Sequence, residues 1–505
     1  MPVRSFSRQG QWLLPPLVDE LIPESHPARF VAAFVDQLDV AVWWSLGITQ
    51  GGEKEGAPAY HPALLLSVWL YGFMTKVRSS RRLEAACHEQ LPYLWLSSNQ
   101  KPDHNTLWRF YKDHRQEMRK LLRLTVRTAV EMDLIDLAVQ AVDGTRLAAN
   151  ASPDQTYNKG GLEKLLERVE AAIADLEAQN STGGDKPASD LPKELQQAQA
   201  LQTRVKAALE TLGREDEHRS YINLSDDEAA LLKTRGGYVV GYNAQAMASP
   251  LKPGPGEKRG GHFVTAVEVV NEVDNHQLLP MMEEAEANSG VAAEITLADA
   301  GYHSGANLAA CEAQSRRVVM PESQAKALQG PYHKDAFLYN SESDTYTCPR
   351  GQKLRYAGIK VDRGKERRWY VVESAAACRV CPAFGECTKN KRHGRSLRIG
   401  PEDATLRRHR AWMKTQEATA IYRLRKQLIE PVFGIVKEHL MGTRRFLLRG
   451  LGNVRAEWSL LATAFNLRVL ARIWAAGKHP CRSSAPGRCS ALLLHSPAES
   501  PLCVA

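Results

Sequence analysis

Residues 294–306 read EITLADAGYHSGA, and the fold depends on where this stretch lies. The apolar run at residues 295–298 has the character of a short buried strand, and it ends on a single acid, Asp299. Another apolar run, at residues 138–142, ends in the same way on Asp143. Two such acids become informative only if their strands are neighbours in one sheet, because the carboxylates then meet at one place.

The order of elements along the chain predicts such a sheet. After the strand that ends at Asp143, strand-like segments follow at residues 238–245 and 262–270, then a helix at 278–287, the strand at 294–298, a helix and a strand at 317–320. Three consecutive strands can pair antiparallel, and helical crossovers then add parallel strands. We therefore predict an α/β fold, a mixed sheet with helices on both faces, in which the first and fourth strands can be neighbours.

Helical patterns surround this sheet. Residues 25–135 read as short helices, with starts at Pro62, at Ser79 and at Asp103. With their arginines and aromatic residues they fit a helix-turn-helix-like DNA module, and a plain helical bundle is the alternative. Residues 161–213 repeat apolar residues every three or four positions, which predicts an antiparallel helical hairpin with a flexible tip at 180–187.

The C-terminal part is expected to contain a helix at 411–439, interrupted at Pro431, and an apolar helix at 453–475. The predicted organisation is a helical N-terminal DNA-binding domain at 1–135, a catalytic domain at 136–340 and 400–475 with a hairpin insertion at 160–215, a Cys-rich insert at 341–399 and a disordered tail at 476–505.

A third acid is available on the helix at 422–437, which reads YRLRKQLIEPVFGIVK. Glu430 and Lys437 are seven residues apart and lie near one helical face, which Arg423 continues. Adjacent carboxylates repel unless a divalent cation lies between them, and Mg2+ prefers such oxygen ligands. Two ions about 4 Å apart could activate an attacking oxygen and stabilise a leaving oxygen in phosphoryl transfer. The alternative is an exposed charge stripe without a function.

These stretches resemble the bacterial insertion-sequence DDE transposases, which have an RNase H-like catalytic domain. The resemblance lies in VDGTR at 142–146, LADAGY at 297–302 and the pattern Tyr422-x2-Arg425, Glu430-x6-Lys437, and it extends over roughly residues 20 to 470. Relatives often have three residues between the arginine and the glutamate, whereas this chain has four.

The resemblance implies strand cleavage at element ends, followed by transfer of the 3′-hydroxyl to target DNA. It implies that Asp143, Asp299 and Glu430 hold Mg2+ or Mn2+. It also implies a homodimer on double-stranded DNA that contains terminal inverted repeats and target sequence. The residues expected to contact DNA are Arg81, Arg82, Arg146, Tyr422, Arg423, Arg425 and Lys437.

Four of the nine cysteines follow the spacing C-x29-C-x2-C-x5-C: Cys348, Cys378, Cys381 and Cys387. Four thiolates could complete a tetrahedral structural zinc site, with His393 as a substitute ligand. Ordinary reduced thiols are the alternative, because only one C-x2-C pair is present. Cys87 and Cys311 lie in apolar helical settings and are expected to pack in the core.

Composition limits the class of protein. The 505 residues are 43% hydrophobic and 24% charged, with a net charge of +9, which is typical of globular proteins. The segment 389–449 carries sixteen Lys and Arg against five Asp and Glu, which suits a phosphate backbone or, alternatively, a solvated helical face. Residues 1–27 resemble no targeting signal, and the apolar run at 62–74 is shorter than the ~20 residues that span a bilayer. We expect a cytoplasmic, nucleoid-associated protein.

Three functions remain open. The first is an active transposase. The second is a transposase-derived protein that binds DNA without catalysis, and the third is a metal-dependent nuclease that cuts without joining. Three acids able to gather metal ions favour an enzyme, since a protein that only binds DNA does not need them.

Overall fold

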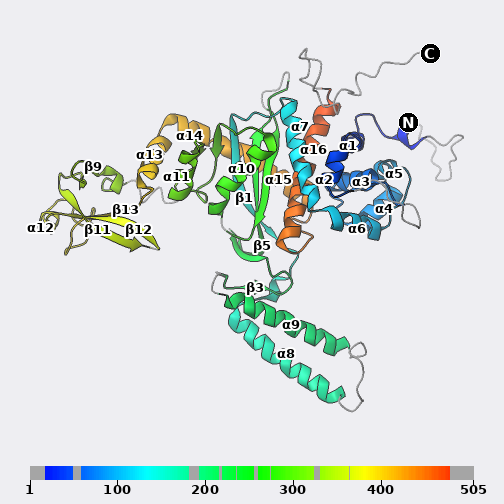
Figure 1. Cartoon of the computed structure of the whole chain (residues 1–505), viewed down its shortest axis with the longest axis horizontal. Helices are drawn as coiled ribbons and strands as arrows, with labels where there is room; N and C mark the ends of the chain where they lie inside the picture. Colours follow the sequence, from blue (N-terminus) through cyan, green and yellow to red (C-terminus); the bar gives the residue numbers. More distant parts are fainter. Residues whose placement is uncertain are drawn as a thin grey trace, which may run out of the picture.

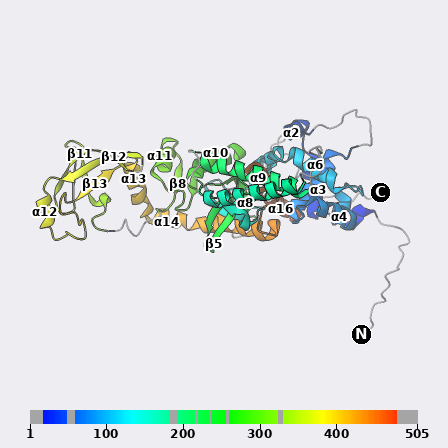
Figure 2. The ribbon, with the colours of Figure 1, turned by 90° about the horizontal axis from the view of Figure 1, so that it is seen from below.

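The computed structural model describes residues 17–48, 59–180, 193–214, 219–234, 236–254, 260–272, 274–322, 330–362 and 364–477. The chain is elongated, with helices of the N-terminal part at one end, a sheet in the middle and a separate smaller sheet at the other end (Figures 1 and 2). A pair of long helices, α8 and α9, projects from the middle in Figure 1.

The central sheet has the predicted mixed topology. The strand order is β4-β5-β1-β7-β8. The strand β6 pairs with residues 243–250 of β5, whereas β4 pairs with residues 237–241. β1 is antiparallel to β5 and parallel to β7, so the first and fourth predicted strands are neighbours. The strands are β1 (Val139–Ala148), β4 (Ala230–Thr234), β5 (Gly237–Pro250), β6 (His262–Val270), β7 (Ile295–Leu297) and β8 (Arg317–Val319).

Asp143 does not close the first strand, contrary to the sequence prediction. β1 continues to Ala148 because residues 144–148 keep their antiparallel pairing with β5, ending with Ala148 opposite Gly241. Asp143 therefore lies in the middle of a long strand. Asp299, in contrast, follows the end of β7 by two residues, as predicted.

Alternate residues of the sheet enter two different cores. Ala141 and Leu297 belong to a core with α15 (Leu424–Ile435) and α16 (Leu451–Ala475). Val142 and Met247 belong to a core on the other face, with α10 (Leu278–Ser289) and α11 (Gly305–Ala313). Successive side chains of a strand point to opposite faces, so Asp143, two residues after Ala141, points toward α15.

The N-terminal helices match the helical prediction and share the larger core with α16 and the sheet. α3 begins with Pro62 at its first turn, and Asp103 caps α6 by accepting a hydrogen bond from the Thr106 amide at 2.6 Å. Ser79 precedes α4 without a side-chain capping bond. The helices are α1 (Pro27–Asp36), α2 (Val40–Ser45), α3 (Pro62–Met74), α4 (Ser80–Glu89), α5 (Leu91–Leu96), α6 (His104–His114) and α7 (Lys120–Glu131).

A buried ion pair joins these helices to α16. The side chains of Arg78, before α4, and Glu457, on α16, are each 2% exposed and contact one another directly. Arg78 also donates to the Met441 carbonyl at 2.6 Å, and Glu457 accepts from the amides of Leu447 and Leu448. Burial raises the pKa of Glu457 and lowers the pKa of Arg78. The pair therefore fixes three distant segments around charges that are costly to bury.

The predicted helical hairpin is present as α8 (Lys159–Asn180) and α9 (Lys193–Gly213). It leaves the sheet through a short ladder of β2 (Thr156–Tyr157) and β3 (Ile222–Asn223), and its apolar residues form cores of their own. Residues 181–187 of the predicted tip lie outside the described residues.

The cysteine-containing segment forms a sheet of order β13-β12-β11-β10-β9, which the sequence pattern did not predict. Its core includes Phe337, Tyr346, Leu354 and Tyr370. The strands are β9 (Leu338–Asn340), β10 (Thr345–Thr347), β11 (Lys353–Asp362), β12 (Lys365–Val372) and β13 (Ser396–Ile399), with the short helix α12 (Ala375–Arg379) before β13.

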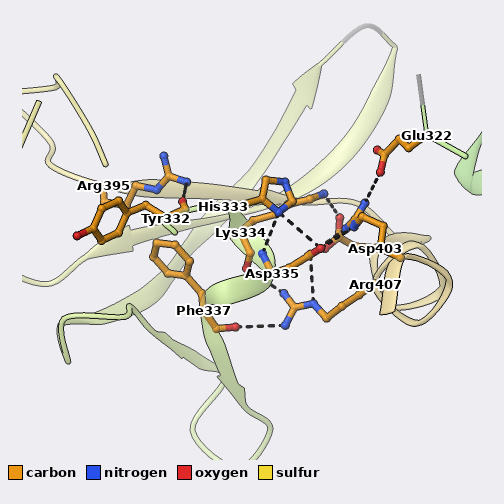
Figure 3. Close-up of polar contacts among 10 residues, drawn as sticks. Glu322, Tyr332, His333, Lys334, Asp335, Phe337, Arg395, Asp403 and Arg407 are labelled. Carbon is orange, nitrogen blue, oxygen red and sulfur yellow. Dashed lines mark hydrogen bonds and ion pairs between the residues drawn. The ribbon is translucent and has the colours of Figure 1, made fainter. Parts of the chain in front are cut away.

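A charged network attaches this sheet to α13 (Asp403–Met413), as Figure 3 shows. Arg410 contacts Asp335 at 2.5 and 2.8 Å, and Arg407 approaches the same carboxylate at 3.6 Å. Lys334 pairs with Asp403 at the start of α13. Several charges fixed in one network hold a relative position better than isolated surface pairs do.

The C-terminal helices differ in two respects from the prediction. Residues 411–439 are divided among α13, α14 (Gln416–Tyr422), α15 and a π-helical turn (Val436–Met441), and Pro431 lies inside α15 without ending it. A proline removes one helix hydrogen bond, but the buried neighbours Val432 and Phe433 hold this helix on the sheet. The sequence predicted a disordered tail at 476–505, and residues 478–505 of it lie outside the described residues. In the described part of the chain, no helix combines the length and apolar character needed to cross a membrane.

We predict that Glu457→Gln lowers the free energy of unfolding by about 3–5 kcal/mol, because it leaves the buried Arg78 charge without its partner. Urea denaturation measures the change. Glu170→Gln is the matched control, since Glu170 pairs with Lys206 on the exposed hairpin, and it should cost less than about 1 kcal/mol. Equal effects of the two substitutions would contradict a structural role for the buried pair.

Candidate active site

The pairing of β1 with β7 brings Asp143 and Asp299 to the same height in the sheet. Ala141 lies opposite Leu297, and each acid follows its partner residue by two positions. The guanidinium of Arg425, on α15, lies between them: its Nη2 is 2.7 Å from Asp143 Oδ2 and 3.9 Å from Asp299 Oδ2. The two predicted acids therefore share one cation.

Burial and neighbouring charge perturb Asp143. Loss of solvent raises the pKa of Asp143 to about 6, with further upward contributions from the charges of Asp299 and Asp274. Arg425 and a 2.9 Å hydrogen bond from the Gly144 amide act in the opposite direction. Arg425 itself is 7% exposed, and its buried Nε has no hydrogen-bond partner among the residues that the structure describes. A carboxylate with a strongly perturbed pKa in a charged cluster is typical of a functional site.

Two further predicted residues on this side of the sheet lie near the acids. Lys437 Nζ donates to Thr145 Oγ1 at 2.5 Å, two residues along β1 from Asp143. Burial and the charge of Arg444 lower the pKa of Lys437, against a smaller upward effect of Asp143. Tyr422 is half-buried beside Arg425, and burial raises the pKa of Tyr422.

The remaining predicted residues are less closely gathered. Glu430 is on α15, between Arg425 and Lys437 in sequence, and its side chain is exposed. Arg423 is exposed just before the same helix. Arg146 is exposed on β1 but points to the face opposite Asp143, because the two residues are three positions apart. The other two predicted DNA-binding residues, Arg81 and Arg82, are exposed on α4.

The structure adds an acid that the sequence analysis missed. Asp274, in the short 3-10 helix Asp274–Gln277 after β6, accepts hydrogen bonds on Oδ1 from Asn243 Nδ2 at 2.8 Å and Gln245 Nε2 at 2.7 Å. β6 runs in the same direction as β1, since both are antiparallel to β5. The available signal was an acid at the end of an apolar run, as at Asp143 and Asp299, but Asp274 comes four residues after β6 ends.

The four predicted zinc ligands line one small cavity of about 20 Å³ in the smaller sheet: Cys348, Cys378, Cys381 and Cys387. The Cys348 sulfur accepts hydrogen bonds from the amides of Arg350 and Gln352, at 3.4 and 3.2 Å. Burial raises the pKa of Cys387, as do the three neighbouring cysteines. His393 is exposed and is not among the residues that line the cavity, whereas Cys87 and Cys311 are buried in the helical cores as predicted.

As the side chains stand, the described residues contain no group of three or more His, Cys, Asp or Glu arranged to hold a metal ion. At the acids, the Arg425 guanidinium occupies the space between Asp143 and Asp299. Carboxylate oxygens suit Mg2+, and the four thiols suit Zn2+, so the chemistry of both donor sets fits the predicted ions. Both metal sites stay predictions.

Comparison with known families identifies the chain. A model described as "Transposase domain (DUF772)" matches residues 16–113, which include helices α1 to α5. A model described as "Transposase DDE domain" matches residues 347–471, which include Glu430 and Lys437. Comparison with curated proteins gave no match. With the mixed sheet and its paired acids, these two matches indicate an insertion-sequence DDE transposase.

Proposed function

We propose that the chain catalyses metal-dependent DNA strand cleavage and strand transfer at the ends of an insertion sequence, with Asp143, Asp299 and Glu430 as the catalytic acids. The observation that carries this proposal is the shared contact of Asp143 and Asp299 with Arg425. Two carboxylates from neighbouring parallel strands face one cationic group, which is the arrangement that a divalent cation would use.

Each residue then has a definite task. Asp143 and Asp299 bind the cation from the sheet, and Glu430 completes the set from α15. A bound Mg2+ would activate the attacking oxygen and stabilise the charge that develops on the phosphate. Arg425 lies between the two acids, so its guanidinium would have to withdraw for a cation to bind there. A freed guanidinium beside the acids is well suited to a DNA phosphate.

DNA is the proposed partner. Tyr422, Arg423, Arg425 and Lys437 all belong to the segment that packs beside the acids, so they would hold the strand near the cut. Three arginines outside that segment would contact DNA farther from it, namely Arg146 on β1 and Arg81 and Arg82 on α4. Cationic side chains that neutralise phosphates release counterions and make binding salt-dependent. Because terminal inverted repeats come in pairs, we propose a homodimer on the DNA.

Two other functions give different products. A protein that only binds DNA would leave the strands intact. A metal-dependent nuclease would cut the ends and leave free 3′-hydroxyls without joining them to target DNA. The cluster of Asp143, Asp299 and Arg425 supports a catalytic protein, because a binding surface gains nothing from repelling carboxylates. Product analysis separates strand transfer from hydrolysis.

We predict that Asp299→Asn lowers the cleavage rate of DNA containing the element ends by at least about 100-fold, because it removes a ligand charge from the proposed ion. Binding to the same DNA should remain within about twofold of wild type. Cleavage with Mg2+ is followed by gel electrophoresis, and binding by mobility shift. Asp227→Asn makes the same chemical change at an exposed residue and should leave both unchanged. Cleavage that survives Asp299→Asn would rule out the catalytic assignment.

The raised pKa of Asp143 predicts a pH dependence of metal affinity. The pKa of Asp143 is about 6, so below about pH 6 its carboxylate is protonated, and a cation has to displace that proton. The affinity for Mn2+ should therefore be nearly constant above about pH 7 and should fall by up to about tenfold per pH unit below about pH 6. Calorimetric titration over this range measures it. Asp143→Asn should bind weakly without that slope, and a flat wild-type profile would contradict the prediction.

We also propose that a zinc ion binds Cys348, Cys378, Cys381 and Cys387. Their common cavity supports this, as do the two amides that donate to the Cys348 sulfur and would stabilise a thiolate. The cysteine side chains would have to draw inward around the ion. Zinc would link the turn before β11, the helix α12 and the loop before β13.

We predict about one zinc per chain in the purified protein, measured by metal analysis. The double variant Cys378→Ser, Cys381→Ser should lose it, because two thiolate ligands are gone. The control Cys311→Ser changes a buried thiol in another core and should keep the metal. Wild-type protein purified without chelator and free of zinc would refute this assignment.

A further inference from the structure

We propose that Asp274 is a fourth carboxylate of the active site and supplies a ligand oxygen to the divalent cation between Asp143 and Asp299. This inference rests on the proposed metal-dependent function and extends it by a residue outside the three predicted acids. It stands on the space left by two glycines, on the way Asp274 is held and on the balance of charge.

Both strand acids are followed by a glycine that makes room for Asp274. A Cβ atom on Gly144 would lie 2.4 Å from Asp274 Oδ1, a distance that real Cβ atoms do not reach. A Cβ atom on Gly301 would lie 2.9 Å from Asp299 Oδ1 and 3.2 Å from Asp274 Oδ2. The carboxylates of Asp274 and Asp299 thus approach the same point from two sides, and an alanine at either glycine would crowd them.

Asp274 is held in a fixed orientation. Asn243 and Gln245, both buried on β5, each donate to Oδ1 rather than to Oδ2. Gln245 is fixed in turn, because its Oε1 accepts a hydrogen bond from the buried hydroxyl of Tyr302. Two amides on one oxygen orient the other oxygen toward Asp299, and preorganised oxygen ligands suit a hard cation.

The three carboxylates of Asp143, Asp299 and Asp274 outnumber the two cationic side chains of this region, Arg425 and Lys437. Arg425 Nη2 is 2.7 Å from Asp143 Oδ2 and 3.9 Å from Asp299 Oδ2, so its positive charge faces two carboxylates, and among the described residues Asp274 has no ion-pair partner. Lys437, the second cationic side chain, donates to the Thr145 hydroxyl and not to a carboxylate. Further positive charge is needed, and a divalent cation supplies it where the carboxylates converge.

A purely structural role for Asp274 makes a different prediction. If Asp274 only accepts hydrogen bonds from Asn243 and Gln245, asparagine can replace it, because its amide oxygen accepts from the same two donors. If Asp274 binds a cation, the same substitution removes the charge and replaces Oδ2 with a donor that cannot bind a metal. Asp274→Asn therefore separates the two roles while keeping the size of the side chain.

The test is Mn2+ binding by the full-length protein without DNA, measured by calorimetry at about pH 7.5. We expect Asp274→Asn to weaken Mn2+ binding by about tenfold or more, with an unchanged melting temperature in the absence of metal. Gly301→Ala leaves every carboxylate intact but places a methyl group between Asp274 and Asp299. It should weaken Mn2+ binding as well, but it crowds Asp299 too, so a wild-type affinity of Asp274→Asn refutes the fourth carboxylate whatever Gly301→Ala does.

The controls separate this inference from the proposed function. Glu272→Gln removes the same charge from an exposed side chain two residues away and should leave Mn2+ binding unchanged. Asp143→Asn and Asp299→Asn should each weaken binding. If these two do so but Asp274→Asn binds Mn2+ like wild type, the fourth carboxylate is refuted and the three-acid site stands. If Asp143→Asn and Asp299→Asn also bind like wild type, the proposed metal-dependent function itself fails.

Discussion

The parallel pairing of β1 with β7 is the constraint on which the rest of the structure depends. It places Ala141 opposite Leu297 and so puts Asp143 and Asp299 at one height, although 155 residues separate them in the chain. A slip by one residue would turn Asp143 to the opposite face of the sheet and away from Arg425. Since both faces of the sheet are packed in apolar cores, such a slip would also move side chains that fit one core into the other.

The acids beside Asp143 repel one another at the proposed active site. Asp143 loses solvent and lies near two other acids, and one arginine offsets only part of the repulsion. The buried Arg78 and Glu457, by contrast, are matched one to one and are surrounded by backbone partners. The first cluster is the one we propose to receive a cation, whereas in the second each charge has its partner and the pair holds segments together. Active sites commonly sacrifice local stability in this way.

The sequence was informative where local pattern and topology agree. Pro62 and Asp103 mark helix starts, and the alternation of strands and helices predicts the mixed sheet and the neighbouring positions of Asp143 and Asp299. Local pattern failed where tertiary contacts decide. Pro431 remains inside a helix because the helix is buried on the sheet. The strand β1 extends past Asp143 because β5 continues to pair with it.

Other features were out of reach for a different reason. The strands β9 to β13 are short or highly charged, so their turns and cysteines dominate the pattern. Asp274 follows a break after β6 that has no recognisable periodicity, and only the space beside Gly144 and Gly301 reveals it. The sequence shows the two glycines, but it does not show that the carboxylate of Asp274 lies in the space beside them.

The hairpin α8–α9 affects how the length of such a chain can change during evolution. It joins β1 to the next strands of the sheet, yet its apolar residues pack within the hairpin, and the β2–β3 ladder closes its base. The distance between the two ends is therefore set at that ladder and is independent of helix length. Whole helical turns can be gained or lost at the far end with little effect on the catalytic sheet, since the entropy of closing a longer connection rises only slowly.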